Sequence, residues 1–421
     1  MSITSAKIEK FVEASKRVFN LCRVENELGI AFFASDPNLR YPWIYIRDFS
    51  CLINGFSKLG DFKTAKRCCE FLLNIQAQDG QWFQKYDDLG ERKDIEKEKS
   101  IIQEDNTPLA LWAILSYIYE SSDEEFKDKN KEKIEKSLSW IEAYHQKSLK
   151  KIGLVYSTTS IHQTPGFNQG YEIWHNSLAV KVFLLAGKIY NNDHYKELAD
   201  CVRENISEKL VIDNRFIRRL DDNKEPDLAP DIIIISPAHF NIFTQGDLIN
   251  KKLNFSEVIK NSLKYLEEKL FDKEMGGFFR YPNEITKKWH PKENWTINDP
   301  LVPGPYLITT SFVIQLYWQL RKENKADKLL DWMLDQTVDG QLSEHLTSRE
   351  RFFLYREKEL GYMLEHKKDK KYLEGVKKNF ESLEKEAEKS EVLHYVLPFP
   401  WAQMEGLKCL KAGGYINKFI L

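Results

Sequence analysis

A short aromatic segment that ends in a cation and a carboxylate is the part of this chain best suited to chemistry. Residues 41–48 read Tyr-Pro-Trp-Ile-Tyr-Ile-Arg-Asp, and apolar residues then recur at helical spacing. Aromatic faces pack against the C–H surface of a sugar ring, and an Arg–Asp pair can exchange hydrogen bonds with neighbouring hydroxyls. The segment therefore predicts the rim of a carbohydrate site. In the alternative interpretation Asp48 only caps the helix and Arg47 only pairs with it.

Similar polar and aromatic groups recur in later segments that separate helical stretches. These segments are residues 79–86, residues 103–108 with Asp105, residues 170–174 with Glu172 and Trp174, residues 276–282 with Arg280, and residues 340–345 with Glu344. Each fragment alone has an ordinary explanation: Asp105 as a helix cap, Trp174 as a core residue, Arg280 as a surface ion-pair member. Their recurrence in successive loops predicts that the loops meet at one site.

The rest of the chain is mainly helical in its apolar spacing. Such stretches are residues 8–21, the residues after Asp48, 62–75, 109–118, 134–141, 178–189, 198–210, 258–270, 308–320, 329–333, 352–364, 372–383 and 404–410. Longer connections, at 79–106, 151–173, 274–306, 336–348 and 390–400, separate pairs of stretches. Connections of that length in a compact domain are often functional.

The alternation of short and long connections is typical of helical hairpins closed into a ring. It predicts an all-α fold, the (α/α)6 barrel of six hairpins, with the long loops at one end. We expect a single domain over residues 1–421, in which residues 1–40 form the first helix and an entry loop. An open solenoid of helical pairs is the alternative, but it would carry a fixed repeat period, which the sequence lacks.

Composition argues against several classes of partner. The formal net charge is −2, so no overall field favours nucleic acid or an anionic membrane. The N-terminus lacks the apolar core of a signal peptide, and no stretch is long and apolar enough for a membrane span, so we expect a cytoplasmic protein. The six cysteines have no metal-ligand spacing, and reduced thiols are expected. We predict no metal and no cofactor; the oligomeric state stays open.

In order and local wording the loop segments resemble glycoside hydrolase family 15, the glucoamylases and glucodextranases, over about residues 40–412. The family's Trp-x-Arg-Asp is similar to residues 45–48, with Tyr45 in place of the tryptophan. The resemblance implies that Arg47 and Asp48 hold hydroxyls of a terminal glucosyl unit. It also implies that Tyr41 lies beside the reaction centre.

The other segments extend the resemblance. Asp105 lies in a segment like the family's Gln-x-Asp-x-Pro, Arg280 in one like Arg-Tyr-Pro, Tyr306 in one like Asn-Pro-Trp, and Trp401 in one like Leu-Thr-Trp-Ser. With Trp174, these residues are expected to contact the sugar. Ser-Glu-His at 343–345 resembles Ser/Pro-Glu-Gln, whose glutamate is the general base, so Glu344 is the first candidate for a catalytic residue.

One departure concerns the general acid. In the family it follows the tryptophan of Leu-Trp-Glu-Glu, whereas here Trp174 is followed by His175 and Asn176. Glu172 aligns with a substrate-binding aspartate of the family and could protonate the leaving oxygen after a loop shift. His175 is the other candidate, because an imidazolium with a pKa near 6.5 is partly populated around neutrality.

The leading hypothesis is an inverting glycoside hydrolase that acts on α-linked glucosyl residues of a small oligosaccharide, with Glu344 activating water. The alternative is a catalytically altered relative that binds carbohydrate without efficient hydrolysis. A helical scaffold unrelated to sugars is the third hypothesis.

Overall fold

The computed structural model describes residues 3–93, 104–158, 169–244, 246–249, 253–281, 303–366 and 369–421. Within these residues fifteen α-helices dominate, and the strands form only sheets of two or three. None of these helices combines the length and the apolar character needed to span a bilayer. The all-α prediction is confirmed.

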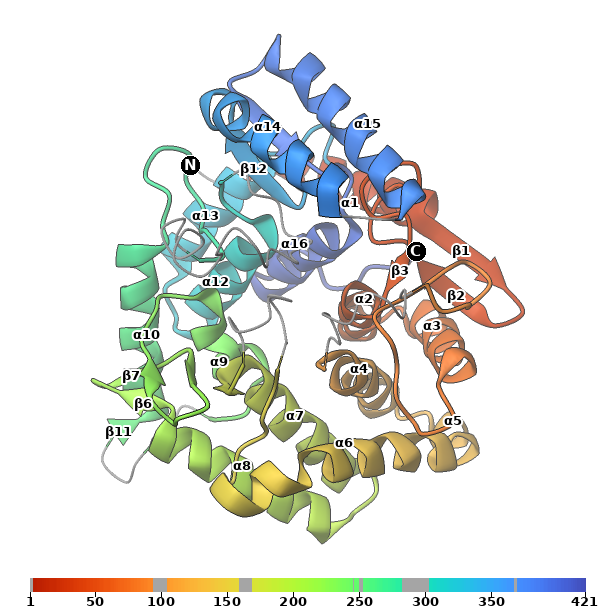
Figure 1. Ribbon diagram of the computed structural model, residues 1–421, viewed down its shortest axis with the longest axis vertical. Helices are drawn as coiled ribbons and strands as arrows, with labels where there is room; N and C mark the ends of the chain where they lie inside the picture. Colours follow the sequence, from red (N-terminus) through yellow and green to blue (C-terminus); the bar gives the residue numbers. More distant parts are fainter. Residues whose placement is uncertain are drawn as a thin grey trace.

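Six helices form an inner ring around the axis of the molecule (Figure 1). In ring order they are α2 (Ile46–Leu59), α4 (Asn106–Ser121), α7 (Ile173–Ile189), α9 (Ser236–His239), α12 (Leu307–Gln319) and α16 (Pro400–Ala412). Each packs against the next, and α16 packs against α2, so the ring is closed. This closure excludes the open solenoid.

An outer helix precedes each inner helix in the chain. The outer helices are α1 (Ser5–Cys22), α3 (Phe62–Ile75), α6 (Lys131–Ile152), α8 (Asp193–Lys209), α10 (Phe255–Lys269) and α13 (Glu323–Asp335). The resulting hairpins form the (α/α)6 barrel that the sequence predicts. The bounds of α3 coincide with those of the predicted stretch 62–75.

The division into inner and outer helices follows from the sequence. Every residue of α4 from Asn106 to Ile118 is buried, and so is every residue of α12 from Leu307 to Ile314. A helix that is apolar around its circumference must be enclosed on all sides. A helix with one apolar stripe can pack that stripe against the enclosed helix and keep its other face in solvent. The outer helix α3 has such a stripe, which includes Cys68 and Leu72.

The remaining elements are short or lie outside the ring. They are helices α5 (Glu124–Lys129), α14 (Arg349–His366) and α15 (Lys370–Ala387), the 3-10 helix η1 (Ile232–Ile235), and strands β1 (Arg23–Asn26), β2 (Gly29–Phe32), β3 (Ile44–Tyr45), β4 (Lys85–Tyr86), β5 (Tyr171–Glu172), β6 (Val211–Ile212), β7 (Arg215–Phe216), β8 (Arg219–Leu220), β9 (Pro226–Asp227), β10 (Leu248–Ile249), β11 (Leu253–Asn254), β12 (His345–Ser348) and β13 (Val392–Tyr395).

Short antiparallel strands join the long loops in pairs. Strand β3 pairs with β4, β5 with β8, and β12 with β13. The sequence predicts loops here and misses the strands, because a strand of two to four residues leaves no alternating pattern to detect.

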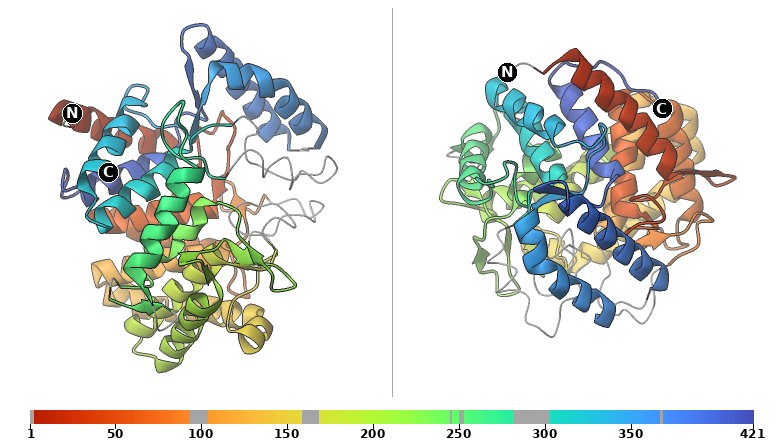
Figure 2. Two further views of the ribbon diagram at one scale, coloured as in Figure 1. Left: turned by 90° about the vertical axis from the view of Figure 1, so that its left-hand side faces the viewer. Right: turned by 90° about the horizontal axis from the view of Figure 1, so that it is seen from above.

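The hairpin α14–α15 stands apart from the ring (Figure 2) and is tied to the loop before Tyr41 by a buried ion pair. Arg40 Nη1 donates to Glu359 Oε1 at 2.6 Å, and the Tyr395 hydroxyl donates to the same oxygen at 2.6 Å. The backbone of α15 also approaches this loop closely. A Cβ at Gly375 would lie 1.9 Å from the carbonyl oxygen of Leu39.

We predict opposite effects for two helical glycines of this hairpin. Gly375→Ala should lower the free energy of unfolding by about 1–3 kcal/mol, because the new methyl group meets backbone that cannot yield. Gly361→Ala should raise it by about 0.5–1 kcal/mol, since a Cβ there meets no atom within 4 Å and alanine favours the helix. Urea unfolding measures both. Stabilisation by Gly375→Ala would contradict the close approach.

Candidate active site

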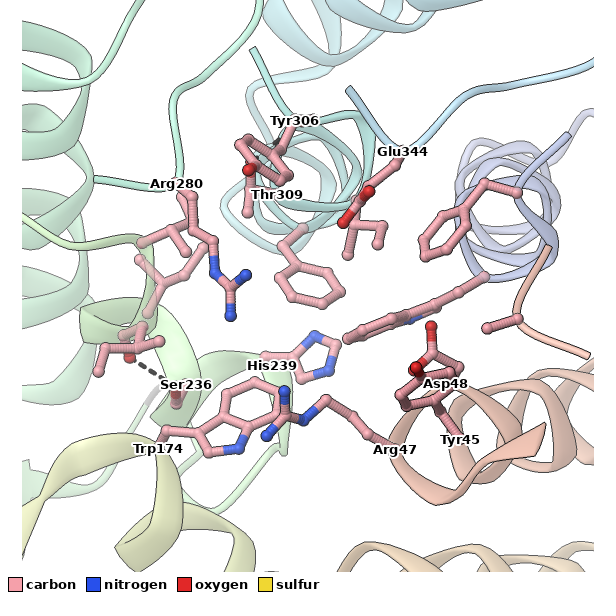
Figure 3. A pocket seen from close by; sticks show the side chains of 18 of the residues that line it. Tyr45, Arg47, Asp48, Trp174, Ser236, His239, Arg280, Tyr306, Thr309 and Glu344 are labelled. Atoms are coloured by element: carbon pink, nitrogen blue, oxygen red, sulfur yellow. Dashed lines mark hydrogen bonds between the residues drawn. The ribbon is translucent and has the colours of Figure 1, made fainter. Parts of the chain in front are cut away.

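A cavity lies at the end of the ring where several inner helices begin (Figure 3). Of the eleven residues that the sequence predicts for the site, eight line it: Tyr41, Arg47, Asp48, Trp174, Arg280, Tyr306, Glu344 and Trp401. These residues meet because α2, α7, α12 and α16 all begin at this end of the ring. Asp48, Trp174 and Trp401 lie in the first turns of their helices. Asp105, Glu172 and His175 do not line it.

Glu344 projects into the cavity from the loop just before β12 (Figure 3). Its backbone is fixed on both sides: its N–H donates to Tyr395 O at 3.0 Å, and its carbonyl accepts from Leu307 N–H at 3.1 Å. The Tyr41 hydroxyl donates to the carboxylate, 3.1 Å from Oε2 and 3.4 Å from Oε1. The carboxylate is therefore held in place and is only 7% exposed.

Arg47 is anchored from behind the cavity wall. Its Nη2 and Nε donate to the two carboxylate oxygens of Asp105 at 2.9 and 3.2 Å. Trp174 Nε1 donates to the same carboxylate at 3.2 Å. Asp105 is fully buried and stands at the N-cap of α4, yet its side chain makes no cap hydrogen bond. Its position therefore supports two lining residues and does not itself reach the cavity, which differs from the sugar contact that the sequence predicts.

Asp48 is not the N-cap of α2. That position belongs to Tyr45, and Asp48 is the third residue of the helix, with its carboxyl group directed into the cavity (Figure 3). Burial raises the pKa of Asp48 to about 7, against the opposing pull of Arg47, its own backbone N–H and Arg280. Near neutral pH the group is therefore present in both forms, and it can donate as well as accept a hydrogen bond.

The two residues predicted as alternative general acids lie away from the cavity. His175 is fully buried in α7, where its ring meets the edge of His145 at 5.1 Å between centroids. Neither ring nitrogen has a hydrogen-bond partner among the described residues, and burial lowers the pKa of His175. The neutral ring lacks the acidic proton that an imidazolium ion carries. Glu172 is also fully buried, in β5 opposite Arg219 of β8.

One wall of the cavity was not predicted. Residues 232–239, which form η1 and α9, contribute Ile232, Ile233, Ile235, Ser236 and His239. The signal that could have found this wall is the run of four isoleucines between Asp231 and the Ser-Pro pair, too short for a helical period. At the bottom of the cavity His239 packs on Phe312 at 4.1 Å between ring centroids, and burial holds its pKa well below the usual range.

The described residues contain no group of three or more His, Cys, Asp or Glu side chains that could hold a metal ion. His162 and His290, as well as Gln103 and Pro282 at the edges of predicted site segments, lie outside the described residues. The described lining offers two guanidinium groups, two carboxyl groups, the imidazole of His239, the hydroxyl groups of Ser236 and Thr309, and aromatic faces.

Comparison with solved structures places the fold among glycosidases. A wild-type glycosidase matches with a TM-score of 0.66 at 13% identity, covering 98% of this chain and 100% of that one. The glucoamylase from Saccharomycopsis fibuligera matches with a TM-score of 0.60 at 13% identity, covering 99% and 98%. A Streptococcus pneumoniae metal-independent α-mannosidase, in complex with α-1,6-mannobiose, matches with a TM-score of 0.61 at 10% identity, covering 97% and 94%.

No family model and no curated protein matches the sequence. At these identities the solved structures establish the six-hairpin fold of glycoside hydrolases, and membership of family 15 stays a prediction.

The buried histidines predict a loss of stability in mild acid. Burial lowers the pKa of His145 and His175 in the folded state, so the unfolded chain binds protons more readily near its own pKa of about 6.5. The stability that the neutral rings contribute is thus present above about pH 6.5 and lost as the pH falls below it. Between pH 7.5 and 5.5 a ring that stays neutral in the folded state should cost up to about 1.4 kcal/mol of unfolding free energy.

Urea unfolding at the two pH values measures this loss in the wild type and in His175→Gln, which should lose less. Because carboxylates also titrate, the exposed residue His194, with 53% of its side chain accessible, serves as the control in His194→Gln. An equal loss in the wild type and in His175→Gln would show that His175 is not held neutral.

Proposed function

We propose that the protein is an inverting glycoside hydrolase that removes an α-linked glucosyl residue from the non-reducing end of a small oligosaccharide. The observation that carries the proposal is the carboxylate of Glu344, held by Tyr41 in a cavity whose facing wall presents Arg47 and Asp48. Such an arrangement provides a base for water on one side of a bound sugar and hydroxyl-binding groups on the other.

Glu344 is proposed as the general base. Water donates its proton to the carboxylate while its oxygen bonds to the anomeric carbon, and the bond from that carbon to the leaving oxygen breaks with its electron pair. The leaving oxygen takes up a proton from a donor. Attack from the face opposite the leaving group inverts the anomeric configuration. The hydrogen bond from Tyr41 orients the Glu344 carboxylate for this task.

The remaining lining is suited to one neutral sugar. Arg47 and Arg280 supply charge-assisted hydrogen bonds, while Trp174, Tyr306 and Trp401 supply aromatic surface. Ile235, His239 and Phe312 also line a second, smaller cavity and so form the floor of this one, which supports action at the end of a sugar chain.

The proton donor separates this proposal from its alternative. Asp48 shares the described lining with Glu344, and its pKa of about 7 leaves it partly protonated near neutrality, which suits an acid catalyst. Asp48 is also placed to hold a hydroxyl group. The second candidate function is carbohydrate binding without efficient hydrolysis. It is favoured by the neutral, buried state of His175, which occupies the position where the resemblance expects a glutamate.

We predict that Glu344→Gln abolishes turnover of maltose-like disaccharides and retains sugar binding. The amide keeps the size of the carboxylate but cannot take a proton from water, and general base catalysis contributes about 10²–10⁴-fold. Product release measures turnover, and calorimetry measures binding. Glu391→Gln, at a side chain that is 83% exposed, is the control and should leave both unchanged. Normal turnover in Glu344→Gln would remove Glu344 from the mechanism.

Asp48→Asn distinguishes acid catalysis from hydroxyl binding. If Asp48 protonates the leaving group, maltose hydrolysis should fall about 10²–10⁴-fold, while hydrolysis of an α-glucosyl fluoride, whose leaving group needs little protonation, should fall far less. If Asp48 only binds a hydroxyl, both rates should fall by the same factor, because both substrates lose about 1.5–3 kcal/mol of binding free energy. A wild type that binds sugar and hydrolyses neither substrate supports the second candidate function.

A further inference from the structure

A second, smaller cavity lies deeper along the barrel axis, on the other side of the floor of the first. It has a volume of about 30 Å³, and its polar lining comes from Lys58, Asn241, Gln315 and Gln319. Ile235, His239 and Phe312 line both cavities and form the partition between them. The spacing along α12 explains the stacking, since Phe312 reaches the partition and Gln315 and Gln319 follow on the same face one and two turns later.

This space exists because one inner helix is short. Helix α9 covers only Ser236–His239, and the chain then turns at Asn241 with a φ of +50°. Every other member of the inner ring has at least 13 residues, so below His239 the ring lacks the side chains that a longer α9 would supply. Asn241 is exposed, which places it at the mouth of the cavity.

Lys58 is the charged group of this cavity. It lies in the last turn of α2, and its ammonium group has no hydrogen bond or ion pair with any described residue. Lys408 of α16, by contrast, is paired with Glu405 at 2.7 Å. Burial, followed by the charges of Lys408 and of Lys181 from α7, lowers the pKa of Lys58 to about 7, and Glu405 and Glu120 of α4 oppose this less strongly.

Below about pH 7 the cavity thus combines a cation that has no counter-charge with a neutral partition. His239 adds no charge, because burial keeps its pKa well below the usual range. Gln315 is already engaged, since its Nε2 donates to Glu405 at 2.9 Å, which leaves Lys58 as the dominant electrostatic feature. Lys58 is half-buried, so its ammonium group is partly shielded from water, and a bound anion would offset both this desolvation and the repulsion from Lys408 and Lys181.

We propose that this cavity binds a small monovalent anion of halide size against the Lys58 ammonium group. The size favours a small ion: a cavity needs about 10–15 Å³ for each water-sized occupant, so about 30 Å³ has room for one halide ion with a water molecule and is small for sulfate, phosphate or a sugar. The site is separate from the sugar cavity and does not rest on the proposed hydrolase activity.

The direct test is a crystal grown in sodium bromide, measured at the bromine absorption edge. An anomalous peak beside Lys58 Nζ is expected, and its absence at full bromide concentration would overturn the proposal. In solution, bromide should raise the melting temperature above that in sodium gluconate of equal ionic strength, whose anion is too large for the cavity. Equal shifts with both salts would mean a general salt effect and no site.

Variants test whether the bromide-specific rise in melting temperature arises at Lys58. Lys58→Met keeps the length of the stem and removes the charge, so the bromide-specific shift should disappear; Lys58→Gln repeats the test if the first variant fails to fold. Lys264→Met, at a side chain that is 74% exposed, should keep the shift. Glu344→Gln should keep it as well, whatever happens to turnover. Loss of the shift in Glu344→Gln, or its retention in both Lys58 variants, would overturn the assignment to this cavity.

Discussion

The buried interaction of Arg47 and Trp174 with Asp105 is the constraint on which the candidate site depends. It joins the first turns of α2 and α7 to the start of α4, three consecutive members of the inner ring. A guanidinium group in this position would be costly without a partner, and a buried carboxylate would be equally costly alone. Because each of them requires the other, the Arg47 guanidinium group is held in position at the wall of the cavity.

The opposite wall is held in a comparable way. Arg40, Glu359 and Tyr395 form a fully buried network that fastens the loop before Tyr41 to the hairpin α14–α15 and to β13. Tyr41 then reaches the carboxylate of Glu344, whose own N–H is bonded to the carbonyl of Tyr395. The two walls thus rest on two separate arginine–carboxylate pairs, so the position of the proposed base is set by residues from four distant segments of the chain.

The sequence predicts what local pattern determines. The stretch 62–75 carries a single apolar stripe and becomes α3 with the same bounds, and the all-round apolar character of the inner helices accounts for their enclosure. The local sequence pattern could not predict which side chains pair with each other in the folded structure. Asp105 looks like a sugar ligand or a helix cap and instead anchors Arg47, because nothing local specifies the partner of a carboxylate. His175 looks titratable, and only its burial in α7 shows that it stays neutral.

The protonation of Asp48 shows how opposing forces meet in the cavity. Its place in the first turn of α2, close to Arg47 and Arg280, favours the carboxylate, because a helix N-terminus and nearby cations both stabilise negative charge. Burial opposes them and prevails, with a pKa of about 7 as the outcome. The same aromatic and aliphatic enclosure that would favour a neutral ligand over a charged one also retains a proton on this carboxyl group. The Asp48 carboxyl group therefore owes its raised pKa to the enclosure of the cavity and not to a feature visible in the local sequence.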